Sequence, residues 1–313
     1  MSLAFIFPGQ GSQTVGMGAE IARSFPTARA VWQEVDQALG QNLFRLVSEG
    51  PEEELTLTEN AQPALMAASL AIMRVLDEEF SIGVEGAAFV AGHSLGEYSA
   101  LAAAESLTIA DTARLLKLRG QAMQRAVPVG QGAMASLIGP RTDLALAEAA
   151  AAEGAKVGVC TVANDNNPGN IVISGDRAGV DRAIEAAKAL GARAIPLNVS
   201  APFHCPLMQP AADEMAAALA SATICEPLAP LVANVTACPG RNVENLRTQL
   251  VEQVTGRVRW RESVQFMAGA GVTRFVEVGA GKVLTGMVKR IAPDAEALAL
   301  NAPDDLEAFA RAI

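Results

Sequence analysis

The sequence predicts an α/β protein with a buried parallel sheet, on three observations. Half of the 313 residues are hydrophobic but only 4% are aromatic, so the core must be mainly aliphatic, as in parallel sheets covered by helices. The short apolar runs at 3–7 and 88–91 read as buried strands. Each run is followed by a glycine-containing turn and then by a segment with helical composition or spacing, an alternation typical of α/β folds.

Composition and charge exclude several classes of function. The formal net charge of −10 provides no basic stripe to neutralise phosphates, so we expect no nucleic-acid partner. The apolar run at 3–7 is too short for a signal peptide, and no apolar segment approaches the roughly 18 residues of a membrane span, so we expect no membrane contact. The four cysteines show no C-x-x-C pair and no metal-ligand spacing, which favours reduced thiols, a cytoplasmic location and no bound metal.

The order of the remaining elements predicts two subdomains. Helical spacing covers 20–48, with a break at Pro26, and then 55–80 and 108–123. From residue 128 the predicted order is strand 133–138, helix 142–153, strand 157–163, a turn at 165–170, strand 171–174, helix 179–190 and strand 193–199. This β-α-β-β-α-β order is that of a ferredoxin-like unit. We therefore expect a small inserted subdomain at 128–198 and a large one formed by 1–127 and 199–313, with a helix at 208–220, strands at 231–234 and 273–278, and a helix at 283–290.

Residues 92–96 read Gly-His-Ser-Leu-Gly and match the G-x-S-x-G elbow. In this motif a sharp turn between a strand and a helix lifts the serine hydroxyl clear of the sheet, and the glycines let neighbouring backbone approach closely. The helix that follows presents a backbone N–H and its positive end to an oxyanion. Ser94 is therefore a candidate nucleophile, and the alternative is an ordinary Gly/Ser turn.

A serine nucleophile needs a base, and the chain has only two histidines. His93 is adjacent to Ser94, where successive side chains diverge, so we expect it to be a packed elbow residue. His204, in a loop between Pro202 and Pro206, is left by elimination as the base. A catalytic triad also needs a group that orients the histidine, usually an acid. Most acidic residues between Ser94 and His204 fall in the predicted insertion, so a backbone carbonyl is an alternative for this third member of the triad.

The loop after the first strand reads Pro-Gly-Gln-Gly-Ser-Gln at 8–13. It is not a phosphate loop, because Thr14 stands where a dinucleotide fingerprint needs glycine and Met17 where a Walker loop needs lysine. An elbow serine needs a second N–H donor from a separate loop. We assign this role to Gln10; the alternative is a plain connection.

Arg119 lies three and four residues after Leu116 and Leu115, beside the apolar stripe of its predicted helix. Charged residues often border such stripes and reach into solvent. Periodicity alone therefore predicts a solvated arginine.

Several motifs in order resemble the malonyl-CoA:acyl carrier protein transacylases of bacterial fatty acid synthesis. They read FPGQGSQ at 7–13, TENAQPA at 58–64, GHSLGEYSA at 92–100, KLRG at 117–120, PFHC at 202–205 and VEVGAGKVLTGMVKR at 276–290. The resemblance spans nearly the whole chain. It implies an α/β-hydrolase-like core with a parallel sheet, an inserted ferredoxin-like subdomain, and ping-pong transfer of malonyl from coenzyme A to the phosphopantetheine thiol of acyl carrier protein.

The resemblance also implies roles for individual residues in the reaction. Ser94 corresponds to the nucleophile and His204 to the base that then acts as acid. The backbone N–H groups of Gln10 and Leu95 correspond to the oxyanion donors. The backbone carbonyl of Gln253 corresponds to the group that orients the histidine, which would fill the place of the missing acid.

Two further residues correspond to the substrate site. Arg119 would bind the malonyl carboxylate, in contrast to the solvated arginine that periodicity predicts. Phe203 resembles the bulky residue of malonyl-selective members and would crowd a 2-methyl branch. We expect a monomer with no cofactor, since the coenzyme A thioester is the substrate.

Alternative functions remain open at this stage. A thioesterase or esterase would use the same serine and histidine with water, but it has no use for a buried arginine. A malonyl transferase could also serve malonate decarboxylation or polyketide synthesis, and a non-catalytic carrier-docking subunit would not need the catalytic set. For an acidic carrier protein we expect a local basic patch, with Lys188, Lys289 and Arg290 as candidates.

Overall fold

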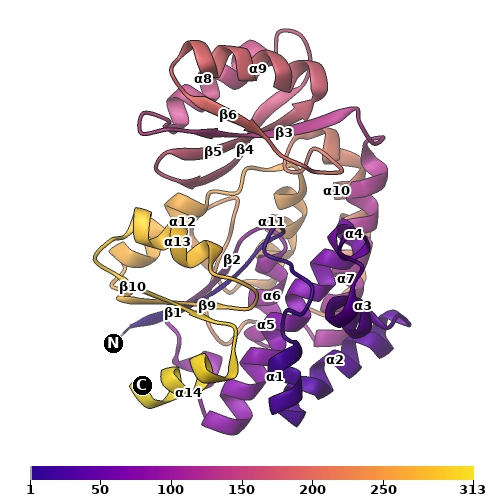
Figure 1. Ribbon diagram of the computed structural model, residues 1–313, viewed down its shortest axis with the longest axis vertical. Coiled ribbons are helices and arrows are strands. Elements are labelled where there is room, and N and C mark those ends of the chain that lie inside the picture. The colour runs from indigo at the N-terminus through magenta and orange to yellow at the C-terminus, as the bar shows by residue number, and fades with distance from the viewer. Residues whose placement is uncertain (1) are drawn as a thin grey trace.

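The computed structural model describes residues 2–313 and contains two sheets with helices packed on them (Figure 1). The larger sheet has six strands in the order β10-β9-β1-β2-β7-β8. The strands are β1 (Leu3–Phe7), β2 (Phe89–Gly92), β7 (Leu231–Val232), β8 (Pro239–Gly240), β9 (Arg274–Val278) and β10 (Glu296–Leu300). All pairings are parallel except that of β7 with β8. The predicted α/β class with a parallel sheet is confirmed.

Strand β1 lies at the centre of this sheet and explains its layering. It pairs with β2 on one side and β9 on the other, and residues 4–7 are fully buried. Ala4 and Ile6 belong to the apolar cluster that includes α12 (Trp260–Gly269) and α13 (Val283–Ile291), whereas Phe5 and Phe7 belong to the cluster on the opposite face. A strand buried on both faces requires the continuous apolar run seen in the sequence.

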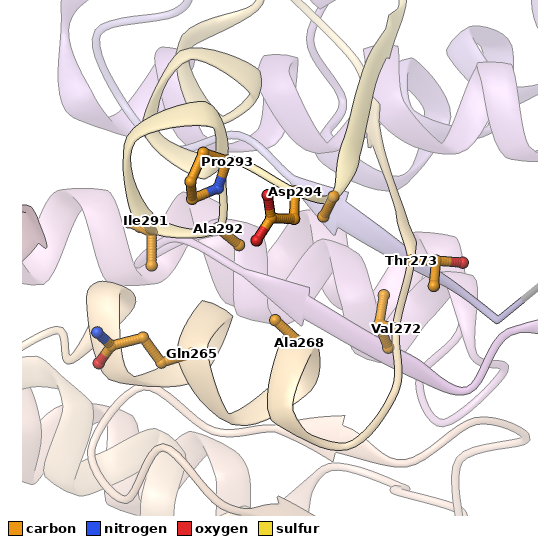
Figure 2. Close-up of a pocket in the computed structure, with 9 residues that line it drawn as sticks. Gln265, Ala268, Val272, Thr273, Ile291, Ala292, Pro293 and Asp294 are labelled. Atoms are coloured by element: carbon orange, nitrogen blue, oxygen red, sulfur yellow. The ribbon is translucent and has the colours of Figure 1, made fainter.

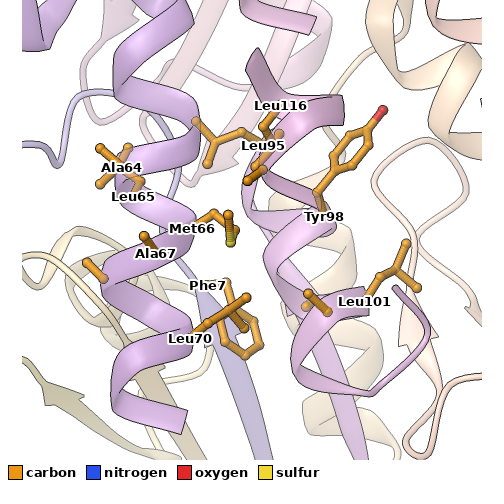
Figure 3. Packing of buried hydrophobic residues seen from close by; sticks show 14 of the residues in the cluster. Phe7, Ala64, Leu65, Met66, Ala67, Leu70, Leu95, Tyr98, Leu101 and Leu116 are labelled. Carbon is orange, nitrogen blue, oxygen red and sulfur yellow. The ribbon is translucent and has the colours of Figure 1, made fainter. Parts of the chain in front are cut away.

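Helices of the N-terminal half cover the second face. They are α1 (Ala19–Ser24), α2 (Pro26–Leu39), α3 (Leu43–Glu49), α4 (Glu52–Thr56), α5 (Thr58–Phe80), α6 (Gly96–Ala103) and α7 (Ile109–Ala126). The break expected at Pro26 is confirmed, because this proline begins α2. Helix α5 is buried along most of its length, and Figure 3 shows Met66 and Leu70 of this helix with Phe7 of β1 in the space beside α6.

The second sheet contains β3 (Gly132–Ile138), β4 (Cys160–Asn167), β5 (Asn170–Asp176) and β6 (Arg193–Pro196) in the order β4-β5-β3-β6, with every pairing antiparallel. Helices α8 (Leu144–Gly154) and α9 (Arg177–Ala189) cover one face (Figure 1). The predicted β-α-β-β-α-β order is confirmed. The opposite face contributes Met134 and Val172 to the main core cluster, so this sheet packs against the rest of the protein.

The turn predicted at 165–170 is wrong in extent. Strand β4 continues to Asn167, and only Pro168 and Gly169 separate it from β5. Polar residues suggested a loop, but Asp165 is buried here and accepts three hydrogen bonds of 2.7–3.1 Å from Arg261. Tertiary pairing thus overrides local propensity.

The remaining elements are α10 (Gln209–Ser221), α11 (Val243–Thr255), α14 (Pro303–Ala312) and the short 3₁₀ helices η1 (Val84–Gly86) and η2 (Pro206–Met208). The predictions of helices near 208–220 and 283–290 are confirmed by α10 and α13, and the strands near 231–234 and 273–278 by β7 and β9, although β7 is only two residues long. No pattern in the sequence led us to expect α11, α12, β8, β10 or α14. The boundaries at 127/128 and 198/199 stay a prediction. No helix within 2–313 has both the length and the apolar character needed to cross a bilayer.

Candidate active site

Several cavities lie in the described part of the chain, and two of them differ clearly in their chemistry. A cavity of about 440 Å³ lies beside α12, the end of α13 and the start of β10 (Figure 2). Its lining has one ionisable side chain, Asp294, and no imidazole or thiol. The second cavity, of about 340 Å³, lies between the carboxyl ends of β1 and β2 and the four-stranded sheet, and is lined by Ser94, Arg119, Phe203 and His204. Ligands of open α/β sheets usually bind at this edge.

The turn between β2 and α6 has the geometry of a nucleophile elbow. Ser94 lies two residues after the end of β2 and has φ of 53°, which is unfavourable for a residue with a side chain. A Cβ on Gly92 would lie 1.9 Å from the backbone of Gly96, and one on Gly96 would lie 2.3 Å from the carbonyl oxygen of Phe7. Both glycines are therefore required for α6 to pack this closely on the strands. The Ser94 N–H donates to Oδ1 of Asn234 at 2.8 Å, which supports the strained turn.

The structure brings His204 to Ser94, as elimination predicted. Its Nε2 lies 2.7 Å from Ser94 Oγ, and its Nδ1 lies 2.9 Å from the backbone oxygen of Gln253 on α11. Because a carbonyl oxygen can only accept, Nδ1 carries the proton and Nε2 is free to accept the serine proton. Burial, with a smaller contribution from the Arg119 charge, lowers the pKa of His204 to about 3, so the imidazole is neutral near pH 7.

Arg119 is buried, with 1% of its surface exposed, so the solvated arginine predicted from periodicity is wrong. Its Nη2 lies 2.7 Å from Gln253 Oε1 and 3.2 Å from Ser94 Oγ, and its Nη1 lies 2.8 Å from Gln62 Oε1. The physical reason is close packing of α7 on α5. A Cβ on Gly120 would come within 2.5 Å of the backbone of the first turn of α5, which turns this side of α7 inward. Burial also lowers the pKa of Arg119.

Two backbone N–H groups at the cavity have no acceptor. Gln10 and Leu95 both line it, and neither N–H donates a hydrogen bond to another residue within 2–313. The Gln10 side chain is fixed by the Thr58 hydroxyl, which donates to its Oε1 at 2.8 Å. A Cβ on Gly9 would lie 2.7 Å from the carbonyl oxygen of His93, so the loop packs directly on the elbow. This arrangement provides N–H donors from two separate segments beside the serine.

Two further residues named from the sequence, His93 and Phe203, line the same cavity. His93 points away from the serine: its Nε2 lies 2.9 Å from Asn166 Oδ1 and its ring packs 5.7 Å from that of Trp260. Burial lowers its pKa. Phe203 is 9% exposed and lines the cavity beside Asn198.

Sequence reasoning missed three buried polar residues around this cluster. Gln62 accepts a hydrogen bond from Arg119, Asn234 accepts one from the Ser94 N–H, and Glu97 accepts from Asn234 and Gln253. A signal was present for Gln62 and Glu97, which are polar residues in otherwise apolar helical segments. Asn234 follows a short buried strand, and only the three-dimensional structure reveals its partners.

An elbow serine hydrogen-bonded to a buried imidazole defines the class of serine-nucleophile enzymes on an α/β scaffold. The chain belongs to the acyl transferase domain family, whose sequence profile matches residues 4–300. It is 48% identical over 306 residues, 97% of each chain, to the malonyl CoA-acyl carrier protein transacylase of Escherichia coli strain K12. The resemblance inferred from the motifs is confirmed.

Solved structures agree with this assignment. The acyl-carrier-protein S-malonyltransferase of Bartonella henselae is 50% identical with a TM-score of 0.97, and the match covers 100% of this chain and 99% of that one. A malonyl-transacylase solved in complex with its type II PKS acyl-carrier protein in the holo form is 43% identical with a TM-score of 0.96, over 100% of both chains.

Proposed function

We propose that this enzyme transfers malonyl from malonyl-CoA to the phosphopantetheine thiol of acyl carrier protein in fatty acid synthesis. The observation that carries the proposal is the buried guanidinium of Arg119 within 3.2 Å of the Ser94 hydroxyl. A cation at this position suits an acyl group that ends in a carboxylate, and a guanidinium can bind a carboxylate through two parallel hydrogen bonds. A hydrolase of uncharged acyl groups gains nothing from it.

In the first half-reaction, Ser94 Oγ attacks the thioester carbonyl of malonyl-CoA while His204 Nε2 accepts its proton. The N–H groups of Gln10 and Leu95 stabilise the resulting oxyanion. The C–S bond then breaks, the coenzyme A sulfur takes the proton from Nε2, and malonyl remains as an ester on Ser94. The Gln253 carbonyl keeps the His204 ring oriented throughout.

The second half-reaction follows the same path with the carrier thiol as nucleophile. The thiol gives its proton to His204 Nε2 and attacks the ester carbonyl. The C–O bond to Ser94 breaks, and Nε2 returns the proton to Oγ. Atoms and charges balance without a metal or redox group, so we propose that the reaction needs no cofactor.

The proposal includes the setting of the enzyme. We place it in the cytoplasm as a monomer with a large subdomain, 1–127 and 199–313, and a small one, 128–198. The active site then lies between the two. Size-exclusion chromatography with light scattering tests the oligomeric state, and limited proteolysis tests the boundaries.

A transfer assay tests the function. The enzyme is incubated with malonyl-CoA and holo acyl carrier protein, and malonyl-carrier and free malonate are measured together. Malonyl-carrier is the expected main product, and apo carrier, which lacks the thiol, is the control. Release of malonate as the main product in the presence of holo carrier would favour the hydrolase.

Phe203 should restrict the acyl group. Phe203→Ser is expected to raise the ratio of kcat/KM for methylmalonyl-CoA over malonyl-CoA by roughly 10- to 200-fold at most, because one methyl group in a pocket changes binding by about 1–3 kcal/mol. Steady-state kinetics with both thioesters measure the ratio. An unchanged ratio would place Phe203 outside the acyl pocket.

Carrier docking should involve α13, whose Val283 and Met287 line the cavity and whose last turn carries exposed Lys289 and Arg290. Lys188 lies on α9, on the face of the four-stranded sheet away from the cavity (Figure 1). We therefore expect Lys289→Glu and Arg290→Glu to raise the carrier's KM by up to roughly fivefold each, since an exposed ion pair contributes about 0.2–1 kcal/mol.

Lys188→Glu is the matched control and should have no effect. The effects of the α13 variants should also shrink as ionic strength rises, because salt screens exposed charges. An unchanged KM at low salt for both α13 variants would exclude this helix from the docking surface.

A further inference from the structure

Glu97 is a fully buried acidic residue three positions after Ser94, on the elbow helix α6. Its Oε2 accepts hydrogen bonds from Gln253 Nε2 at 2.6 Å and from the Asn234 N–H at 3.3 Å. Its Oε1 is buried and has no hydrogen-bond partner among the described residues 2–313. Within residues 2–313, no arginine or lysine forms an ion pair with this carboxylate, and the charge of Arg119 acts on it only from a distance. Burying an acid without a cationic partner costs folding free energy. A function of Glu97 at the active site would explain why it is buried there.

The first connection from Glu97 to the site runs through the Gln253 side chain. A carboxylate only accepts hydrogen bonds, so the amide must turn its Nε2 toward Glu97. Its Oε1 therefore faces Arg119, whose Nη2 donates to it at 2.7 Å. The backbone oxygen of the same Gln253 accepts from His204 Nδ1 at 2.9 Å. The same Nε2 also donates to the Ser94 carbonyl at 2.9 Å. An ionised Glu97 adds a charged acceptor at this end of the amide, so it stabilises the orientation in which Oε1 meets Arg119 and holds the residue that orients His204.

The second connection runs through Asn234. Its backbone N–H donates to Glu97 Oε2, its Oδ1 accepts from the Ser94 N–H at 2.8 Å, and its Nδ2 donates to the Gly92 carbonyl at 2.7 Å. Asn234 therefore binds the backbone on both sides of the strained elbow, at Gly92 and at Ser94. Glu97 Oε2 thus binds both Asn234, which holds the Ser94 elbow, and Gln253, which contacts His204 and Arg119.

We propose that Glu97 is a positioning residue whose ionised carboxylate orients Gln253 and Asn234. Through them it holds Arg119, His204 and Ser94 in the geometry that acyl transfer requires. The inference rests on the proposed function and adds to it a residue that touches neither substrate nor reacting atoms. It predicts that the enzyme loses activity when Glu97 becomes protonated.

The pH at which this happens follows from the surroundings of Glu97. Burial, the largest cause, raises the pKa of Glu97 to about 7, although the bonds from Gln253 and Asn234 and the charge of Arg119 oppose the shift. The other titratable groups are Tyr98 of α6, whose pKa burial raises to about 12, and His204, beyond Gln253, whose pKa lies near 3. The segments that carry Gln253 and Asn234 contribute only these neutral amides to the carboxylate.

The sign of the pH dependence is therefore defined. Glu97 is charged above its pKa and neutral below it, so acylation should increase as pH rises through about 7. When the rate of a serine enzyme falls as the pH drops below neutrality, the fall is usually attributed to protonation of the histidine. Here His204 stays neutral throughout that range, which makes Glu97 the group that produces the limb.

The test is the pH profile of kcat/KM for malonyl-CoA from about pH 5 to 9, a range in which Glu97 but not His204 changes charge. The wild type should show one acidic limb near neutrality. Glu97→Gln should lose the limb and settle about 10- to 100-fold below the wild-type plateau, because misplacement of reacting groups costs about this much. Glu97→Asp, which keeps the charge, should keep a limb and recover part of the activity.

Glu277→Gln is the matched control, because Glu277 is also a glutamate with a pKa raised by burial but binds the N–H groups of Leu284 and Thr285, away from this network. It should keep the wild-type limb. A Glu97→Gln enzyme that keeps the limb overturns the inference, since the limb then belongs to another group. If instead the wild type forms no malonyl-enzyme at any pH, the proposed function itself fails.

A measurement on the wild type covers the case in which Glu97→Gln does not fold. The assigned ¹³C signal of the Glu97 carboxyl should titrate together with the kinetic limb. Titration of this carboxyl in the ordinary range for glutamate, near pH 4.3, would overturn the inference without any variant.

Discussion

Ser94→Ala should lower malonyl transfer by roughly 10⁴- to 10⁶-fold and abolish the malonyl-enzyme, because no other group replaces the nucleophile. His204→Ala should retain slow acylation, since Ser94 Oγ and the N–H donors of Gln10 and Leu95 remain. The two variants are thus distinguished by whether an acyl-enzyme forms at all. Rapid mixing with malonyl-CoA, followed by acid quench and mass spectrometry, measures this.

The control is Ser99→Ala on the same helix. Ser99 is buried and its hydroxyl has no hydrogen-bond partner among the described residues, so removing it should leave acylation unchanged. A Ser94→Ala enzyme that still acquires the malonyl group would exclude Ser94 as the nucleophile.

Arg119→Ala should lower kcat/KM for malonyl-CoA by about 30-fold or more while acetyl transfer holds or rises. An unpaired buried charge costs on the order of 2–5 kcal/mol, and acetyl offers the guanidinium no carboxylate. The native arginine therefore favours malonyl and disfavours acetyl at once. Arg119→Lys should recover only part of the malonyl activity, because an ammonium cannot form the two parallel bonds.

The ratio of the two activities separates this role from a structural one. Removal of Arg119 also leaves Gln62 Oε1 and Gln253 Oε1 without the donor they have now, so thermal unfolding must be measured in parallel. Equal losses for malonyl and acetyl would mean that Arg119 supports the fold or binds coenzyme A, and the carboxylate role would have to be abandoned.

The part of the fold that could be predicted is the part fixed by local pattern. The apolar run of β1, the G-x-S-x-G turn and the order of elements in the second sheet follow from residues near one another in the chain. The end of β4 could not be predicted, because Asp165 is polar locally and pairs with Arg261 far along the chain.

The site shows the same division. Ser94 and His204 follow from a motif and from the scarcity of histidines, but the burial of Arg119 depends on the contact of Gly120 with α5. The family resemblance, not periodicity, predicted a buried role for Arg119 and the orienting carbonyl of Gln253. The network of Glu97, Asn234 and the Gln253 side chain joins segments more than 100 residues apart, and no local pattern encodes it.

The most direct test of the central claim is the intact mass of the enzyme after malonyl-CoA, and again after holo acyl carrier protein is added. We expect one malonyl group per chain, located on Ser94 by peptide mapping, and its complete discharge with an equivalent gain of malonyl-carrier. No adduct, an adduct on another residue, or discharge to free malonate instead of malonyl-carrier would contradict the account.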